Sequence, residues 1–216
     1  MDEDAMTITD GRVKRGDHTR RAVLAHAVDV ASTQGLEGLS IGRLAADLSI
    51  SKSGLFAHFG AKEELQLATI RAARRIYADT VISPAMETPP GLGRIWALSE
   101  AWMAYSRGRV FPGGCFFSKA AHEFAARPGV VRDALIAANN EWLEILRRAV
   151  DDARSLGDLA QDVDVDRLVF ELNALLDSAN LRSILGDDRS YTRAATSVRT
   201  LLDEAASEEA PRPWET

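Results

Sequence analysis

The stretch SIGRLAADLSISKSGLFAHF, residues 40–59, decides the fold. Its apolar residues recur at helical spacing on both sides of residues 49–50, which predicts two short helices with one apolar face each. Ser40 and Ser51 are good N-caps for these helices. Because the connection is short and Ala45 is small, we expect the helices to cross steeply, as in a helix-turn-helix. The apolar positions are Ile41, Leu44, Ala45, Leu48, Leu55 and Phe59.

The other face of the second predicted helix carries groups suited to nucleic acid. Lys52, Ser53 and Gly54 lie at its N-terminal end, the end that reaches base edges when such a helix enters the major groove. The helix dipole at that end also favours a nearby phosphate. Lys62 falls in the first turn of the next helix, where a cation is unfavourable unless an external anion binds beside it. These features favour DNA binding over a plain helical hairpin.

Residues 17–77 resemble the DNA-binding domain of the TetR/AcrR family of bacterial transcriptional regulators. An ordered set of segments carries the resemblance: a helix from about Thr19 to Gly35, GLSI at 38–41, SKSGLFAHF at 51–59 and KEEL at 62–65. Such a set is far more specific than a lone helix-turn-helix.

The resemblance also implies which residues contact DNA. The predicted set is Ser40, Arg43, Ser51, Lys52, Ser53, Gly54, Phe56, His58 and Lys62. Within it, residues 52–54 are expected to face bases, and Phe56, His58 and Lys62 to lie along the phosphate backbone. For His58 the alternative is packing in the core beside Phe59.

Three residues depart from the family pattern. Phe56 stands where the family usually has tyrosine, so we expect the phosphate contact of a hydroxyl to be missing and Phe56 to face the core. Gly42 stands where an arginine is common, which leaves Arg43 as the nearby cation. Ser49 replaces a common turn glycine, which predicts backbone strain at that turn.

Composition agrees with a helical protein of two parts. The chain has 216 residues, 46% of them hydrophobic, enough for a substantial core. Strand-type alternation is scarce, and glycine and proline cluster at a few breaks, so the predicted fold class is all-α. The net charge is −6, yet residues 11–75 hold 11 Lys and Arg against 6 Asp and Glu. A basic end on an acidic body is expected when that end alone meets phosphate.

The predicted organisation is a three-helix helix-turn-helix domain followed by a larger helical domain. The boundaries are a polar tail at 1–16, the DNA-binding domain at 17–77, the larger domain at 78–207 and a polar tail at 208–216. Further helices are expected at 65–82, 92–110, 116–126, 130–156, 166–185 and 191–206.

By the resemblance, the larger domain dimerises through its last two long helices and binds a small effector. Residues 166–185 carry an apolar stripe too wide for one neighbour to cover, and residues 191–206 add a second stripe. The predicted partner is a second copy of the chain; the alternative is that both helices are core within one chain. Because a two-fold protein repeats its recognition helix, the expected DNA partner is a roughly palindromic double-stranded operator.

Aromatic residues concentrate between residues 96 and 142, around the loop FPGG at 111–114. They are suited either to line a cavity for an apolar or aromatic small molecule or to fill the core. The candidate effector-binding residues are Trp96, Trp102, Met103, Tyr105, Phe117, His122, Trp142 and Phe170, with Ser118, Asn139 and Asn173 as further polar candidates. The run FPGGCFF also resembles one subgroup of TetR-type C-terminal domains, which does not specify a ligand.

Other classes of function have little support in the sequence. Catalytic motifs are missing and the four histidines lack metal-binding spacing, so no enzyme, metal or cofactor is predicted. Cys115 is the single cysteine, and an inert buried thiol is favoured over a redox role. No apolar run approaches the ~20 residues of a membrane span, and the acidic N-terminus is unlike a signal peptide, so we expect a cytoplasmic protein.

The sequence therefore predicts a homodimeric DNA-binding regulator, a repressor that a small molecule releases from its operator. Repression is implied by the resemblance alone. Two alternatives stay open. One is an activator or partner-controlled regulator of the same fold, and the other is a helical small-molecule-binding protein or enzyme with an unused helix-turn-helix.

Overall fold

The computed structural model describes residues 3–215, with side chains from His18 onward. It confirms an all-helical fold with an N-terminal helix-turn-helix domain and a larger helical domain. The helices are α1 (Glu3–Gln34), α2 (Ile41–Asp47), α3 (Lys52–Phe59), α4 (Lys62–Tyr77), the π-helical turn η1 (Ala78–Ile82), α5 (Ser83–Met86), α6 (Leu92–Arg107), α7 (Phe116–Phe124), α8 (Val130–Leu156), α9 (Val165–Ile184) and α10 (Ser190–Ala205).

Helices α2 and α3 begin where their capping residues predict. Ser40 Oγ accepts a hydrogen bond from Arg43 N at 3.1 Å, and Ser51 Oγ accepts one from Gly54 N at 3.1 Å. Each bond satisfies one of the N–H groups that a first helical turn leaves free. Between the helices, Ser49 has φ 55°, a left-handed conformation that glycine adopts at lower cost. The strain predicted at this turn is therefore present.

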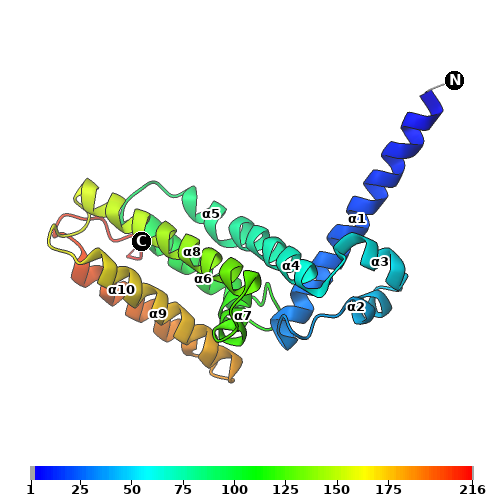
Figure 1. The fold of residues 1–216 in the computed structure, drawn as a ribbon. Coiled ribbons are helices and arrows are strands. Elements are labelled where there is room, and N and C mark those ends of the chain that lie inside the picture. The colour runs from blue at the N-terminus through cyan, green and yellow to red at the C-terminus, as the bar shows by residue number, and fades with distance from the viewer. Residues whose placement is uncertain (1–2, 216) are drawn as a thin grey trace.

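Helix α1 begins at Glu3, well before the start predicted near Thr19. Figure 1 shows its N-terminal part extending away from the rest of the molecule. Residues 3–16 of the predicted polar tail are thus helical in the structure. The segment has no proline, and Gly11 and Gly16 each cost only about 1 kcal/mol relative to alanine, which a long helix tolerates.

Helix α4 connects the two domains, since it packs on both α1 and α8. Helices α6, α8, α9 and α10 form the body of the larger domain, and α7 lies at the end nearest α1 (Figure 1). Gly129 and Gly157 bound α8 at the residues predicted, with φ 139° and 86°. The π-helical turn η1 continues α4 without a break, a feature that apolar periodicity does not predict.

The C-terminal segment folds back on the body instead of forming the predicted polar tail. Ser207 N donates to Asp158 O at 2.9 Å, and Arg212 pairs with Asp203 at 3.0 Å. The ring of Trp214 packs on Trp96, with centroids 5.6 Å apart. The charged residues suggested a solvated tail, but one tryptophan supplies enough apolar surface to anchor the segment.

Candidate DNA-binding surface and effector cavity

Helix α3 presents a polar face to solvent and buries the other. Leu55 and Phe59 are buried, whereas Lys52 and Ser53 are exposed. Gly54 and His58 are half-buried, and the His58 ring centroid lies 6.3 Å from that of Phe59. The residues expected to face bases therefore lie together at the exposed N-terminal end of the helix, the end from which a recognition helix contacts base edges.

Phe56 does not face the core, contrary to the expectation from the sequence. Its side chain is 55% exposed. Successive helical residues are rotated by about 100°, so the buried Leu55 and Phe59 leave Phe56 on the solvent side. An exposed ring beside the recognition residues is available for apolar contact with DNA, for example with a thymine methyl group.

Lys62 is engaged within the protein. Its Nζ donates to Glu37 O at 2.7 Å and to Glu37 Oε2 at 2.9 Å. Hydrogen bonds from Lys62 and Gln66 hold the pKa of Glu37 below its ordinary value, so this carboxylate is ionised at neutral pH. Lys62 keeps 45% of its side chain exposed, so a phosphate can reach it, but DNA must compete with Glu37 for the ammonium group.

The other cations predicted to contact DNA differ in whether their side chains have polar partners within the protein. Arg43 Nη1 donates to Gln34 Oε1, and Arg43 Nε lies 3.7 Å from Asp47 Oδ2. Lys52 makes no ion pair or hydrogen bond with any side chain that the structure describes. Of Arg43, Lys52 and Lys62, Lys52 is thus the cation that can reach DNA without losing an internal partner.

Arg20, which the sequence analysis did not select, holds the far end of α3. Its Nη1 donates to His58 O at 2.9 Å, and its guanidinium lies 4.9 Å from the centroid of the Phe59 ring. These two contacts join the last turn of α3 to α1. The partners are 38 residues apart, so no local pattern pointed to them.

A hydrogen-bonded junction ties the larger domain to the turn between α1 and α2. Glu123 of α7 accepts hydrogen bonds from the backbone N–H groups of residues 36 and 37, at 2.7 and 3.0 Å. Bonds to an ionised acceptor are roughly twice as strong as neutral ones. Lys119, also on α7, donates to Thr33 O at 2.5 Å. Helix α7 therefore holds both the end of α1 and the segment that carries Glu37.

The loop before α7 packs directly on the end of α1. A methyl group on Gly113 would lie 1.8 Å from Ser32 O, and Gly113 N donates to Ser32 Oγ at 3.1 Å. Gly113→Ala is therefore expected to lower the free energy of unfolding by about 1–3 kcal/mol, because two backbone segments must move apart. Urea denaturation followed by circular dichroism measures this loss.

Gly93→Ala is the matched control for Gly113→Ala. A methyl group on Gly93, inside α6, would meet its first neighbour, Thr88 Cγ2, at 3.5 Å. This is ordinary contact, and alanine has the higher helix propensity, so no loss of stability is expected. Equal losses in the two variants would show that the junction is not the tight contact described here.

A cavity of about 1220 Å³ lies among α1, α4, α7, α8 and α9. Ligand pockets commonly span about 300–1,000 Å³, so the space suffices for a small organic molecule. Four of the predicted effector-binding residues line it, namely Trp102, Phe117, His122 and Trp142. The polar candidates Ser118, Asn139 and Asn173 line it as well.

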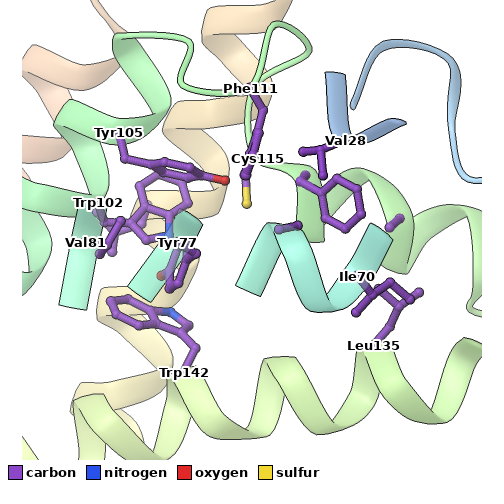
Figure 2. Packing of buried hydrophobic residues seen from close by; sticks show 14 of the residues in the cluster. Val28, Ile70, Tyr77, Val81, Trp102, Tyr105, Phe111, Cys115, Leu135 and Trp142 are labelled. Atoms are coloured by element: carbon purple, nitrogen blue, oxygen red, sulfur yellow. The ribbon is translucent and has the colours of Figure 1, made fainter. Parts of the chain in front are cut away.

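Tyr77 of α4 lies at the centre of an aromatic wall (Figure 2). Its ring meets those of Tyr105, Phe117 and Trp142 edge-on, with centroids 5.3, 5.7 and 5.7 Å away. Such geometry is the favoured one for aromatic pairs. Burial raises the pKa of Tyr77 and of Tyr105 well above the ordinary value, so both hydroxyls are neutral at physiological pH. Tyr77 falls within the helix expected at 65–82 and is not among the residues predicted to bind an effector.

A chain of hydrogen bonds forms a second wall of the cavity. Trp142 Nε1 donates to Asn173 Oδ1 at 2.9 Å, and Asn173 Nδ2 donates to Asp177 Oδ2 at 3.1 Å. Ser118 Oγ donates to the other carboxylate oxygen of Asp177 at 2.8 Å. These polar groups satisfy one another, and the chain fixes the orientation of the Trp142 ring.

The other four predicted effector-binding residues lie outside this cavity. Trp96 packs between Trp214 and the guanidinium of Arg199, which is 4.8 Å from its ring centroid. Met103 is buried in the core, and Tyr105 lies behind Tyr77, with its hydroxyl directed toward Cys115 (Figure 2). Phe170 is 72% exposed on α9. Aromatic density in the sequence does not separate residues that line a space from residues that fill one.

Cys115 lines the cavity but is buried. Burial raises the pKa of its thiol, so the thiol is protonated at neutral pH. A protonated, inaccessible thiol is a poor nucleophile, which agrees with an inert role.

Two features are missing from the part of the chain that the structure describes. From His18 onward, no cluster of three or more His, Cys, Asp or Glu is placed to hold a metal ion. Of the helices that the structure describes, none is both long and apolar enough to cross a bilayer.

Comparison with known families assigns both halves of the chain. The family described as "Bacterial regulatory proteins, tetR family" matches residues 23–69, and "Tetracyclin repressor-like, C-terminal domain" matches residues 91–198, half of the chain. The chain belongs to the TetR family of transcriptional regulators. TetR-family membership makes it a DNA-binding transcription regulator with an N-terminal helix-turn-helix domain. No curated protein matches the sequence.

Solved structures share the TetR fold over most of the chain. A TetR regulator from Chloroflexus aurantiacus is 25% identical, with 89% of this chain and 98% of that chain covered and a TM-score of 0.82. A regulator from Saccharomonospora viridis in complex with choline is 17% identical, covers 89% and 100%, and has a TM-score of 0.76. AibR in complex with isovaleryl coenzyme A and operator DNA is 21% identical, covers 87% and 97%, and has a TM-score of 0.67.

In this TetR-family chain, the outer face of α9 and α10 has an uncovered apolar surface. Phe170, Leu175 and Leu201 line a groove of about 510 Å³ between the two helices. Two further exposed apolar residues near the end of α9, Leu181 and Ile184, line the first cavity and not this groove. Of the stripe predicted on α9, Leu168, Val169, Leu172, Leu176 and Ala179 are buried within one chain, and only Leu175 is half-buried. The uncovered apolar surface therefore comes mainly from Phe170, outside that stripe, and an exposed apolar patch is typical of an interface.

Proposed function

We propose that this TetR-family protein is a homodimeric repressor that leaves its operator when a small molecule enters the cavity. The position of α7 carries the proposal. Lys119 lines the cavity and also donates to Thr33 O, and the next turn of the helix carries Glu123, which holds residues 36 and 37. A ligand that displaces α7 therefore acts on the end of α1 and on the turn leading to the helix-turn-helix.

Release from the operator requires that the effector bind two conformations of the protein with different affinities. A ligand lowers operator affinity only by as much as it prefers the conformation that does not bind DNA. In the structure the Glu123 bonds at this junction are made, and we infer that they are broken in the conformation that does not bind DNA. Because those bonds are charge-assisted, breaking them costs enough to separate the states.

The bound molecules of the neighbouring structures support a ligand-binding role for this fold. The Saccharomonospora viridis protein binds choline, and AibR binds isovaleryl coenzyme A and operator DNA. The two ligands differ greatly in size and charge, so the neighbours do not identify the effector of this chain.

The uncovered surface of α9 and α10 supports the dimer. Two copies joined there about a two-fold axis place two α3 helices on one side of the DNA, which requires a roughly palindromic operator. The half-site centres are expected to lie about one helical turn, or a multiple of it, apart.

Selection of bound sequences from random double-stranded DNA tests the proposal. The expected product is an inverted repeat, and transcription in vitro from a promoter carrying it is expected to fall when the protein is added. A rise in transcription would show an activator. Failure to enrich any sequence would contradict the proposed operator binding.

A further inference from the structure

The lining of the cavity between α4 and α7 is unbalanced in charge. Five cationic side chains line it, Arg20, Arg71, Arg74, Arg75 and Lys119, against the two carboxylates of Glu141 and Asp177. The chain as a whole has a net charge of −6, so this excess of positive charge is local. A hollow with one sign of charge concentrates ligands of the opposite sign.

Two of these arginines have side chains without any ion-pair or hydrogen-bond partner among the described residues. Arg74 pairs with Glu141, Lys119 is bonded to Thr33 O and Arg20 to His58 O. The side chains of Arg71 and Arg75, by contrast, form no ion pair or hydrogen bond with any part of the chain that the structure describes. They are four residues apart on α4, and like charges at this spacing repel each other. An anion between them would reverse that repulsion.

The two carboxylates do not supply this missing charge. Glu141 is held by Arg74. Asp177 accepts hydrogen bonds from Ser118 and Asn173, and through Asn173 it is linked to Trp142. Both acidic groups are thus satisfied by their own neighbours, and neither lies on the same helix as the free arginines.

Apolar and aromatic groups make up much of the rest of the lining. Tyr77, Phe117 and Trp142 present ring surface to the cavity, and Leu135 and Ile82 add aliphatic surface. Burial of an apolar body against such groups contributes about 25 cal/mol per Å². The cavity therefore combines an apolar part with an unneutralised cationic part.

We propose that the ligand of this cavity is an amphipathic anion. Its apolar or aromatic body lies against Tyr77, Phe117 and Trp142, and its carboxylate, sulfonate or phosphate group binds Arg71 and Arg75. The proposal rests on the proposed function only in calling this ligand the effector; the charge preference of the cavity is a separate property of the free protein.

Two fluorescent probes with the same aromatic body test the charge preference. 1-Anilinonaphthalene-8-sulfonate carries a sulfonate, and N-phenyl-1-naphthylamine lacks it. Both are titrated into the full-length protein without DNA. In Arg71→Gln/Arg75→Gln the sulfonate probe is expected to bind about tenfold or more weakly, the effect of losing one charge-assisted contact. The neutral probe is expected to bind within about twofold of its original affinity, because the apolar wall is unchanged.

Two control variants separate charge from shape and from surface binding. Arg71→Lys/Arg75→Lys keeps both charges and is expected to retain the sulfonate probe within about threefold. Arg148→Gln removes a cation of α8 that does not line the cavity, and is expected to change neither probe. If the Gln variant loses both probes equally, or loses neither, the amphipathic-anion proposal is wrong.

A competition and a DNA-binding assay complete the test. Decanoate is expected to displace the sulfonate probe at least about tenfold more effectively than 1-decanol or decylamine, because only decanoate pairs with the arginines. Equal displacement by the three would overturn the charge assignment. If the arginines select decanoate but decanoate leaves operator affinity unchanged, the cavity proposal holds and release by such anions, as part of the proposed function, fails.

Discussion

Phe170→Asp is expected to convert the protein to a monomer and to reduce operator affinity by at least about a hundredfold. Phe170 lies on the apolar groove of α9 and α10 and is 72% exposed, so the substitution leaves the core of one chain intact. Across a two-fold axis it places two unpaired carboxylates in an apolar contact, which disfavours association. Separate subunits then lose the avidity of two linked recognition helices, which is commonly 10²–10⁴-fold.

Sedimentation velocity and operator titration measure the two effects in the same preparation. Ile136→Asp is the matched control, because Ile136 is also an exposed apolar residue but lies on α8, outside the groove. It is expected to remain dimeric and to bind the operator normally. A Phe170→Asp protein that still sediments as a dimer would place the interface elsewhere.

Lys52→Ala and Lys62→Ala are expected to weaken DNA binding in different ways. Lys52 has no side-chain partner among the described residues and is exposed at the N-terminal end of α3. We propose that this end reads bases, so the loss of Lys52 should cost about 1–3 kcal/mol on the operator and relax discrimination at one position of each half-site. Lys62→Ala should weaken binding to all sequences alike and lower the salt slope by about one unit per lost phosphate contact. Isotherms at several salt concentrations on operator and random DNA separate the two patterns.

The ion pair between Lys62 and Glu37 suggests a second variant, Glu37→Gln, to compare with Lys62→Ala. Glu37→Gln leaves Lys62 without its internal carboxylate, so binding to random DNA should tighten and its salt dependence should steepen.

His58→Ala should have the same kind of effect as Lys62→Ala, but a smaller one. Phe56→Tyr should tighten DNA binding by adding a hydroxyl group that can bond a phosphate. If Lys52→Ala leaves the ratio of operator to random affinity unchanged while Lys62→Ala alters it, the two roles are reversed.

The helix-turn-helix could be predicted from sequence because its determinants are local. Ser40 and Ser51 each bond an amide three residues away. In the larger domain the ends of α8 are equally local, because Gly129 begins and Gly157 ends that helix by their own backbone angles. Such signals need no knowledge of the rest of the fold. The backbone strain at Ser49 is also predictable from local sequence, because it depends on one residue in one turn.

The residues that join the domains could not be predicted, because their partners are distant in sequence. Arg20 reaches His58, and Glu123 reaches residues 36 and 37, across 38 and 86 or more positions. The cavity lining is a tertiary property for the same reason. Tyr77 lines it and Trp96 does not, although both are aromatic residues on amphipathic helices.

Helix α4 makes the two domains one cooperative unit. It begins at Lys62, directly after α3, and ends at Tyr77, in the aromatic wall of the cavity. Loosening either end therefore removes packing from the other, and Glu123 adds a second link. We expect a single melting transition, with amides of α2 and α3 exchanging more slowly in the whole chain than in a fragment ending at Tyr77. We therefore expect the DNA-binding half to lose stability when it is moved to another protein.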